Sequence, residues 1–94
     1  MEIKLEQTTT KGSFYIEDDG KRLAEMTFSK AGDKLIIIDH TEVSDVLRGK
    51  NAGKQLVAAG VEYARKNGVK ILPLCPFAKS VFDKVEEYGD VLSK

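Results

Sequence analysis

The hydrophobic pattern changes its period once along the chain, near residue 50, and this change constrains the fold more than any other feature. Before it, apolar and polar residues alternate in short runs separated by turn residues, which is the period of β-strands. After it, apolar residues recur every three or four positions, which is the period of an amphipathic helix. The sequence therefore predicts a sheet built mainly by the first half and helices in the second.

The first half predicts a meander of four strands, at residues 2–9, 13–17, 23–28 and 34–40. Gly12 separates the first two strands in this prediction, and residues 18–21 (Asp-Asp-Gly-Lys) carry the signal of a tight hairpin, because Asp and Gly tolerate positive φ. Residues 35–38 are apolar in succession, which is typical of a strand buried on both faces. The fourth strand is therefore expected to be buried on both faces.

The second half predicts a helix at residues 51–67, a short strand at 69–74 and a second helix that begins at Pro76 and ends at Gly89. Proline suits the first position of a helix, and Asn67-Gly68 is a helix stop. A strand, helix, strand unit favours parallel pairing of the fourth and fifth strands through a right-handed crossover. The expected class is α/β (α+β): a mixed, mostly antiparallel sheet of about five strands with two helices.

Length, composition and net charge exclude several classes of protein. The 94 residues suit one domain, residues 1–94, and no apolar run approaches the roughly 20 residues of a membrane span or forms a signal peptide. The only cysteine, Cys75, cannot form an internal disulfide and suits a reducing cytoplasm. One Cys and one His cannot build a structural zinc site, so no metal is expected. A net charge of zero argues against nucleic-acid binding.

Positive charge is concentrated in residues 46–70, which carry six basic groups and one acidic group. Within this segment, a loop with two glycines, Gly49 and Gly53, leads into the first predicted helix. The first N–H groups of a helix lack internal partners and attract phosphate, while basic side chains add long-range attraction. The segment predicts an anion site, although a glycine-containing loop before a solvated basic helix would show the same pattern.

The stretch from Val43 to Gly53 resembles the coenzyme A signature of the GNAT superfamily, the acetyl-CoA-dependent N-acetyltransferases. The family pattern is Gln or Arg, two residues, Gly, one residue, then Gly or Ala, after a strand ending in Val and before an amphipathic helix. Arg48 matches the first position and Gly53 the last, whereas Asn51 replaces the middle glycine. Asn is enriched at positive φ, so the loop shape is expected to survive.

The loop and the segments on either side of it together resemble a small, single-domain branch of GNAT-like proteins. This resemblance rests on residues 40–43, 48–49 and 73–77. It implies acetyl-CoA as co-substrate, backbone pairing of pantetheine near Val43 and a pyrophosphate held by residues 48–54. The cofactor-binding residues that it implies are Val43, Arg48, Gly49, Lys50, Asn51, Ala52, Gly53 and Lys54. The two helices and the final two strands that help larger GNAT enzymes to bind their acceptor are absent, so the substrate stays open.

Two side chains are candidates for the chemistry of transfer. Cys75 precedes Pro76 at a predicted helix start, where the helix dipole favours a thiolate, although cysteines are also often buried and inert. His40 is predicted to end the fourth strand at the edge of the cofactor cleft and could act as a base, or it could be a hydrogen-bonded histidine without a catalytic role. Glu42 ranks below His40 as a base acting through water.

The resulting expectation is an N-acetyltransferase that moves acetyl from acetyl-CoA to an amine of a small molecule or protein, with an acetyl-cysteine on Cys75 as one route. A second interpretation is a CoA-binding module without turnover, whose acceptor site a partner supplies. A third is a cysteine thioesterase that uses the same residues with water as acceptor. Amine-dependent release of CoA separates the first from the third, and the oligomeric state stays open.

Overall fold

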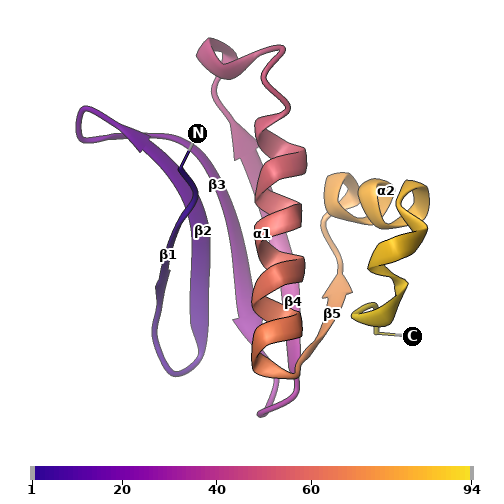
Figure 1. Cartoon of the computed structure of the whole chain (residues 1–94). Helices are drawn as coiled ribbons and strands as arrows, with labels where there is room; N and C mark the ends of the chain where they lie inside the picture. The colour runs from indigo at the N-terminus through magenta and orange to yellow at the C-terminus, as the bar shows by residue number, and fades with distance from the viewer. Residues whose placement is uncertain (1, 94) are drawn as a thin grey trace.

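The computed structural model describes residues 2–93 and shows a five-stranded sheet with a long helix against it (Figure 1). The strands are β1 (Lys4–Gln7), β2 (Lys11–Asp18), β3 (Lys21–Lys30), β4 (Leu35–Val43) and β5 (Lys70–Pro73). The helices are α1 (Ala52–Asn67) and α2 (Pro76–Lys84), with short 3-10 segments η1 (Asp45–Leu47) and η2 (Glu86–Asp90). Within residues 2–93, no helix has the length and apolar character needed to cross a membrane.

The strands follow one another across the sheet in chain order, β1-β2-β3-β4-β5. The first four are antiparallel neighbours, whereas β5 pairs with β4 in parallel after the chain crosses over through α1. Parallel pairing of neighbouring strands requires such a crossover. The predicted fold class, element order and parallel pair are confirmed.

Two turns differ in how well the sequence predicted them. The β2–β3 hairpin is confirmed, with Asp19 and Gly20 at φ 52° and 79°. Gly12 is not a break between strands: it lies within β2, where a Cβ would come within 2.3 Å of the ring atom Cζ of Phe28. The turn lies just before it, held by the Thr8 hydroxyl, which accepts the N–H of Lys11. Gly12 is thus required by close packing and not by turn geometry.

The core lies between α1 and one face of the sheet. Leu56 and Val57 of α1 are fully buried, as are Met26 of β3 and Ile38 of β4. The prediction that residues 35–38 are buried on both faces is wrong, because Leu35 and Ile37 are only half-buried. They point to the face that α1 does not cover, since successive side chains of a strand alternate between faces. We call this uncovered surface the open face.

The chain after α2 covers the outer edge of β5. Helix α2 ends at Lys84 and not at Gly89, because Val85 leaves the helical conformation and η2 follows. This turn brings the end of the described chain beside β5, where Ile71 donates its N–H to Val91 and accepts the N–H of Ser93. Arg65 of α1 forms an ion pair with Asp90, with Nη2 and Oδ1 2.9 Å apart. The parallel strand β5 is therefore paired on both sides.

Candidate functional site

Strands β4 and β5 separate halfway along β4. They pair only from Leu35 to Ile38, and the pairing of β4 with β3 shifts register at the same place, between Thr27 and Phe28. The N–H groups of both Leu74 and Cys75 converge on the Ile38 carbonyl, each at 3.1 Å. Beyond this point β4 continues without β5 beside it. We call residues 39–43 the free half of β4 and residues 35–38 its paired half.

A cleft of about 450 Å³ opens beside the free half of β4. Strand β4 contributes two side chains, the segment from η1 to the first turn of α1 contributes most of the wall, and α2 contributes one aromatic ring. The lining residues are Thr41, Val43, Leu47, Arg48, Gly49, Asn51, Ala52, Gly53, Lys54 and Phe77. The structure therefore gathers at one cleft the residues that the sequence predicted for cofactor binding, with Lys50 between Gly49 and Asn51 in the same loop.

The loop enters α1 through two left-handed residues, Gly49 at φ 80° and Asn51 at φ 57°. The expected positive φ of Asn51 is confirmed, and its side chain makes no capping hydrogen bond to α1. The first N–H groups of a helix that lacks a side-chain cap can donate to an anion. Gln55 fixes the loop by donating from Nε2 to the Lys50 carbonyl at 3.0 Å.

Gly53 and Phe77 form the contact between α1 and α2 inside the cleft. A Cβ on Gly53 would lie 2.6 Å from Cζ of the Phe77 ring, so any larger residue there requires the ring to shift. Phe77 remains 39% exposed toward the cleft. Sequence reasoning missed both Phe77 and Thr41 as cleft residues. Both residues lie in segments that carry the family resemblance, 40–43 and 73–77, and this was the sequence signal for them.

The basic side chains of the loop are exposed. Arg48 is paired loosely with Asp45, its Nη2 3.3 Å from Oδ1, and both side chains are more than four-fifths exposed. Lys50 and Lys54 are also exposed. Exposed pairs of this kind contribute little to stability, so an anion can replace Asp45 at Arg48 at small cost. The charge of this loop is available to a ligand.

Cys75 lies between the free half of β4 and the start of α2. It directly precedes Pro76, the first residue of α2, and is 5% exposed. Its thiol donates a hydrogen bond to Oγ1 of Thr41, with the two atoms 3.3 Å apart. Burial acts to raise the pKa of the Cys75 thiol, but hydrogen bonds from Thr41 and from the N–H groups of Ala78 and Phe77 outweigh it, so the pKa is lowered from its ordinary value.

His40 lies on the other face of β4 from this thiol. Strand β4 runs to Val43, so the prediction that His40 ends the strand is wrong. His40 is paired with Thr27 of β3 on the open face, where its side chain is 65% exposed and Nε2 lies 3.2 Å from Oε1 of Glu42. Thr41, the next residue, faces the cleft and contacts Cys75. The structure therefore brings Cys75 to Thr41 and not to His40.

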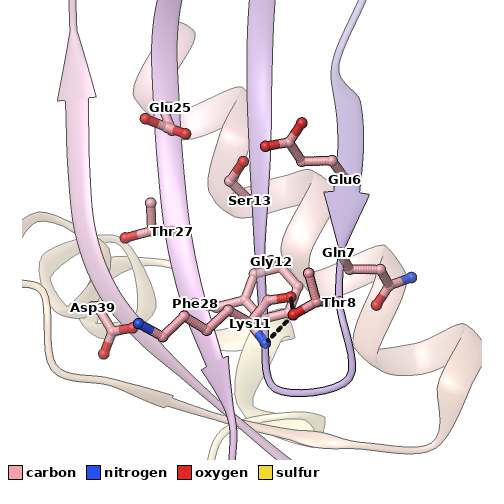
Figure 2. Close-up of a pocket in the computed structure, with 10 residues that line it drawn as sticks. All are labelled: Glu6, Gln7, Thr8, Lys11, Gly12, Ser13, Glu25, Thr27, Phe28 and Asp39. Carbon is pink, nitrogen blue, oxygen red and sulfur yellow. Dashed lines mark hydrogen bonds between the residues drawn. The ribbon is translucent and has the colours of Figure 1, made fainter.

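A larger hollow, of about 620 Å³, lies on the open face of the sheet (Figure 2). In Figure 2 helix α1 lies behind the sheet, so this hollow is on the opposite side of the sheet from α1. The hollow is lined by Glu6, Gln7, Thr8, Lys11, Gly12, Ser13, Glu25, Thr27, Phe28 and Asp39. Within residues 2–93, no three His, Cys, Asp or Glu side chains cluster in a way that could hold a metal ion.

Comparison with known proteins identifies the family. The family described as GCN5-related N-acetyl-transferase matches residues 13–91. A GCN5-like protein from Staphylococcus aureus is 40% identical, over 96% of this chain and 87% of that one, with a TM-score of 0.72. The chain therefore belongs to the GCN5-related N-acetyltransferases, and the resemblance seen in its sequence is confirmed.

More distant structures share the fold. A ribosomal-protein-alanine N-acetyltransferase from Brucella melitensis biovar Abortus is 18% identical, with a TM-score of 0.64 over 93% of this chain and 64% of that one. An aminoglycoside N-acetyltransferase in complex with CoA is 15% identical, with a TM-score of 0.58 over 82% of this chain and 67% of its own. No protein among the curated ones matches the chain significantly.

Proposed function

We propose that this protein transfers an acetyl group from acetyl-CoA to the nitrogen of an amine. The observation that carries the proposal is the left-handed turn from Gly49 to Asn51, which leads into the uncapped start of α1 and opens onto the cleft beside the free half of β4. Membership of an acetyltransferase family supports the same activity. Such a turn and helix start offer N–H groups to phosphate.

In this proposal the CoA pyrophosphate binds at residues 48–54 and pantetheine runs along the free half of β4 near Val43. Strand β4 leaves this edge open, because β5 pairs only with its other half. The thioester then lies toward Thr41, on the same wall of the cleft. Phe77 supplies an apolar surface at the same place.

The reaction requires an amine with a free electron pair. Its nitrogen attacks the acetyl carbonyl, the bond from carbon to the CoA sulfur breaks, and the electron pair of that bond leaves with the sulfur. The nitrogen gives up one proton, which His40 or Glu42 can accept if the amine arrives from the open face, where both side chains are exposed. An acetyl-cysteine on Cys75 is the alternative route, in which the thiol attacks first.

The cofactor site is tested by titrating CoA while backbone amide NMR shifts are recorded. We expect the largest shifts at residues 48–54 and an affinity that falls as salt rises, because phosphate contacts at exposed lysines are screened. Lys54→Ala is expected to weaken binding, whereas the matched control Lys66→Ala, an exposed lysine near the other end of α1, is expected to leave it unchanged. Largest shifts in the β1–β3 meander would contradict the proposed site.

The activity is tested by measuring free CoA thiol with a panel of amines: spermidine, an aminoglycoside, and peptides with a free amino terminus or a free lysine. Amine-dependent release supports the proposed transfer, and release that is independent of amine indicates a thioesterase. Mass spectrometry of the protein mixed with acetyl-CoA alone shows whether an acetyl group is carried on Cys75. Absence of release with every amine would refute the proposed activity.

A further inference from the structure

The contact between Thr41 and Cys75 joins the wall of the cleft to a buried thiol. Thr41 lines the cleft and is half-buried, whereas Cys75 is 5% exposed and does not line it. The thiol donates to the Thr41 hydroxyl at 3.3 Å. A hydroxyl donates one hydrogen and accepts two, so Thr41 can accept from Cys75 and donate into the cleft at the same time.

We infer that Thr41 relays a proton from the Cys75 thiol to the sulfur of the departing CoA. This inference rests on the proposed function, because it assumes a thioester beside Thr41. In this inference Cys75 is the source of the proton and acts through Thr41. Thr41 is the residue that contacts the reacting sulfur directly.

The proton balance of the step is complete. As the carbon–sulfur bond breaks, the Thr41 hydroxyl gives its hydrogen to the CoA sulfur, and the Cys75 thiol gives its hydrogen to the Thr41 oxygen. Thr41 ends as a hydroxyl that donates to the Cys75 thiolate, and CoA leaves as a neutral thiol. The thiolate regains a proton from water, while the proton lost by the amine passes to water through His40 or Glu42.

The surroundings of Cys75 favour this role over that of a nucleophile. A nucleophilic sulfur must reach the acetyl carbon, but Cys75 is 5% exposed and does not line the cleft. The hydrogen bonds from Thr41 and the N–H groups of Phe77 and Ala78 stabilise the thiolate that remains after the proton has left. They lower the pKa of this thiol from its ordinary value, which favours release of its proton toward the departing sulfur.

Charged groups on the elements around Cys75 do not replace Thr41 as its partner. His40 and Glu42 of β4 lie on the open face, and Lys54 of α1 and Lys79 of α2 are exposed. The immediate partners of the thiol are therefore the neutral hydroxyl and backbone amides. We therefore expect the pKa of Cys75 to depend on its hydrogen bond with Thr41.

The experiment compares Thr41→Val, which keeps the shape and removes the hydroxyl, with Thr41→Ser, which keeps the hydroxyl. The substrates are acetyl-CoA and whichever amine of the panel gives the fastest release. We expect Thr41→Val to lower kcat about 100-fold, a usual contribution of proton transfer to a leaving group, and Thr41→Ser to recover most of it. The CoA affinity measured by NMR and the Tm are expected to stay the same in both Thr41 variants. Thr10→Val, in an exposed turn, is the matched control for a Thr→Val substitution.

The pH dependence separates a proton donor from a nucleophile. The ratio of the parent rate to the Cys75→Ala rate cancels the titration of the amine, and the variant has no thiol of its own to titrate. If Cys75 donates a proton, this ratio falls toward one as pH rises through the pKa of Cys75, since the thiolate has no proton to give. If Cys75 is a nucleophile, the ratio rises over the same range.

Cys75→Ala is expected to match Thr41→Val, and the double variant to be no slower than either, because the two residues act as one unit. Unchanged kcat in Thr41→Val, a ratio that rises with pH, or an acetyl group found on Cys75 would each overturn the relay while leaving the proposed function intact. An inactive parent protein would overturn the proposed function, and the relay with it.

Discussion

The two halves of β4 differ in sequence, pairing and surroundings. The paired half, residues 35–38, is entirely aliphatic and hydrogen-bonded to a strand on each side. The free half, residues 39–43, is polar except for its last residue and has a strand on one side only. One strand therefore serves as the centre of the core at one end and as the wall of a cleft at the other.

This difference shows how a strand inside a small sheet can form the wall of a cleft. The register shift between Thr27 and Phe28 and the convergence of two N–H groups on the Ile38 carbonyl mark the place where β5 leaves β4. Bulges and irregular pairing are common beside active sites because they redirect side chains and end pairing. The predictions below test whether the paired half determines stability and the free half determines function.

The largest effect is expected in the paired half. Ile38→Ala removes a fully buried side chain and is expected to lower the free energy of unfolding by about 2–5 kcal/mol. Ile37→Ala, on the half-buried side, is the matched control and should cost on the order of 1 kcal/mol. Urea denaturation measures both, and equal losses would show that the open face is as well packed as the face that α1 covers.

The next effect concerns the cleft. Gly53→Ala places a Cβ against the Phe77 ring and is expected to cost about 1–3 kcal/mol of stability, the range for overpacking, and to weaken CoA binding. A double-mutant cycle with Phe77→Leu, which shortens the opposing side chain, should recover part of both losses. Strictly additive changes would mean that the Gly53–Phe77 contact does not shape the cleft.

A smaller effect is expected at Asn51, where the free half leads into α1. Its left-handed conformation is strained by about 1–2 kcal/mol for a side chain with a Cβ and more for a β-branched one. Asn51→Gly is therefore expected to preserve or tighten CoA binding, and Asn51→Val to weaken it about tenfold, as isothermal titration calorimetry would show. The same affinity in both variants would argue against phosphate binding by this turn.

The smallest effect is expected for the ion pair between Arg65 and Asp90, which holds η2 beside β5. Strand β5 in turn pairs with the paired half of β4. Arg65 lowers the pKa of Asp90 in the folded protein, so the pair contributes stability at pH values above the unfolded pKa of Asp90. That contribution is lost as pH falls through the lower, folded pKa. Asp90→Asn is expected to flatten the acid limb of a plot of Tm against pH below about pH 4.

Thermal melts from pH 2 to 7 would measure this change, with Glu87→Gln as the control for a nearby exposed carboxylate. CoA affinity at neutral pH should not change in either variant, because both positions lie in η2, away from the cleft. An acid limb that stays as steep in Asp90→Asn as in the parent would show that the ion pair does not stabilise this edge.

Local signals explain what the sequence could predict. Period-two runs, the Asp19-Gly20 hairpin and the Gly68 helix stop each act through a few neighbouring residues, so strand order and α1 were predictable. The loop motif was also local, because a left-handed turn and a helix start are encoded within residues 48–54. The predicted end of α2 was wrong because Val85 and Tyr88 continue a helical pattern, whereas the chain leaves the helical conformation at Val85 and then turns back toward β5.

The sequence by itself determined the element order, the left-handed loop before α1 and the presence of one thiol at a helix start. Only the tertiary structure decided which groups meet: Gly12 packs under Phe28, Gly53 against Phe77, and Cys75 against Thr41 and not His40. The physical reason is that alternation along β4 assigns each residue to a face, but which face becomes the cleft depends on where α1 packs and where β5 separates from β4.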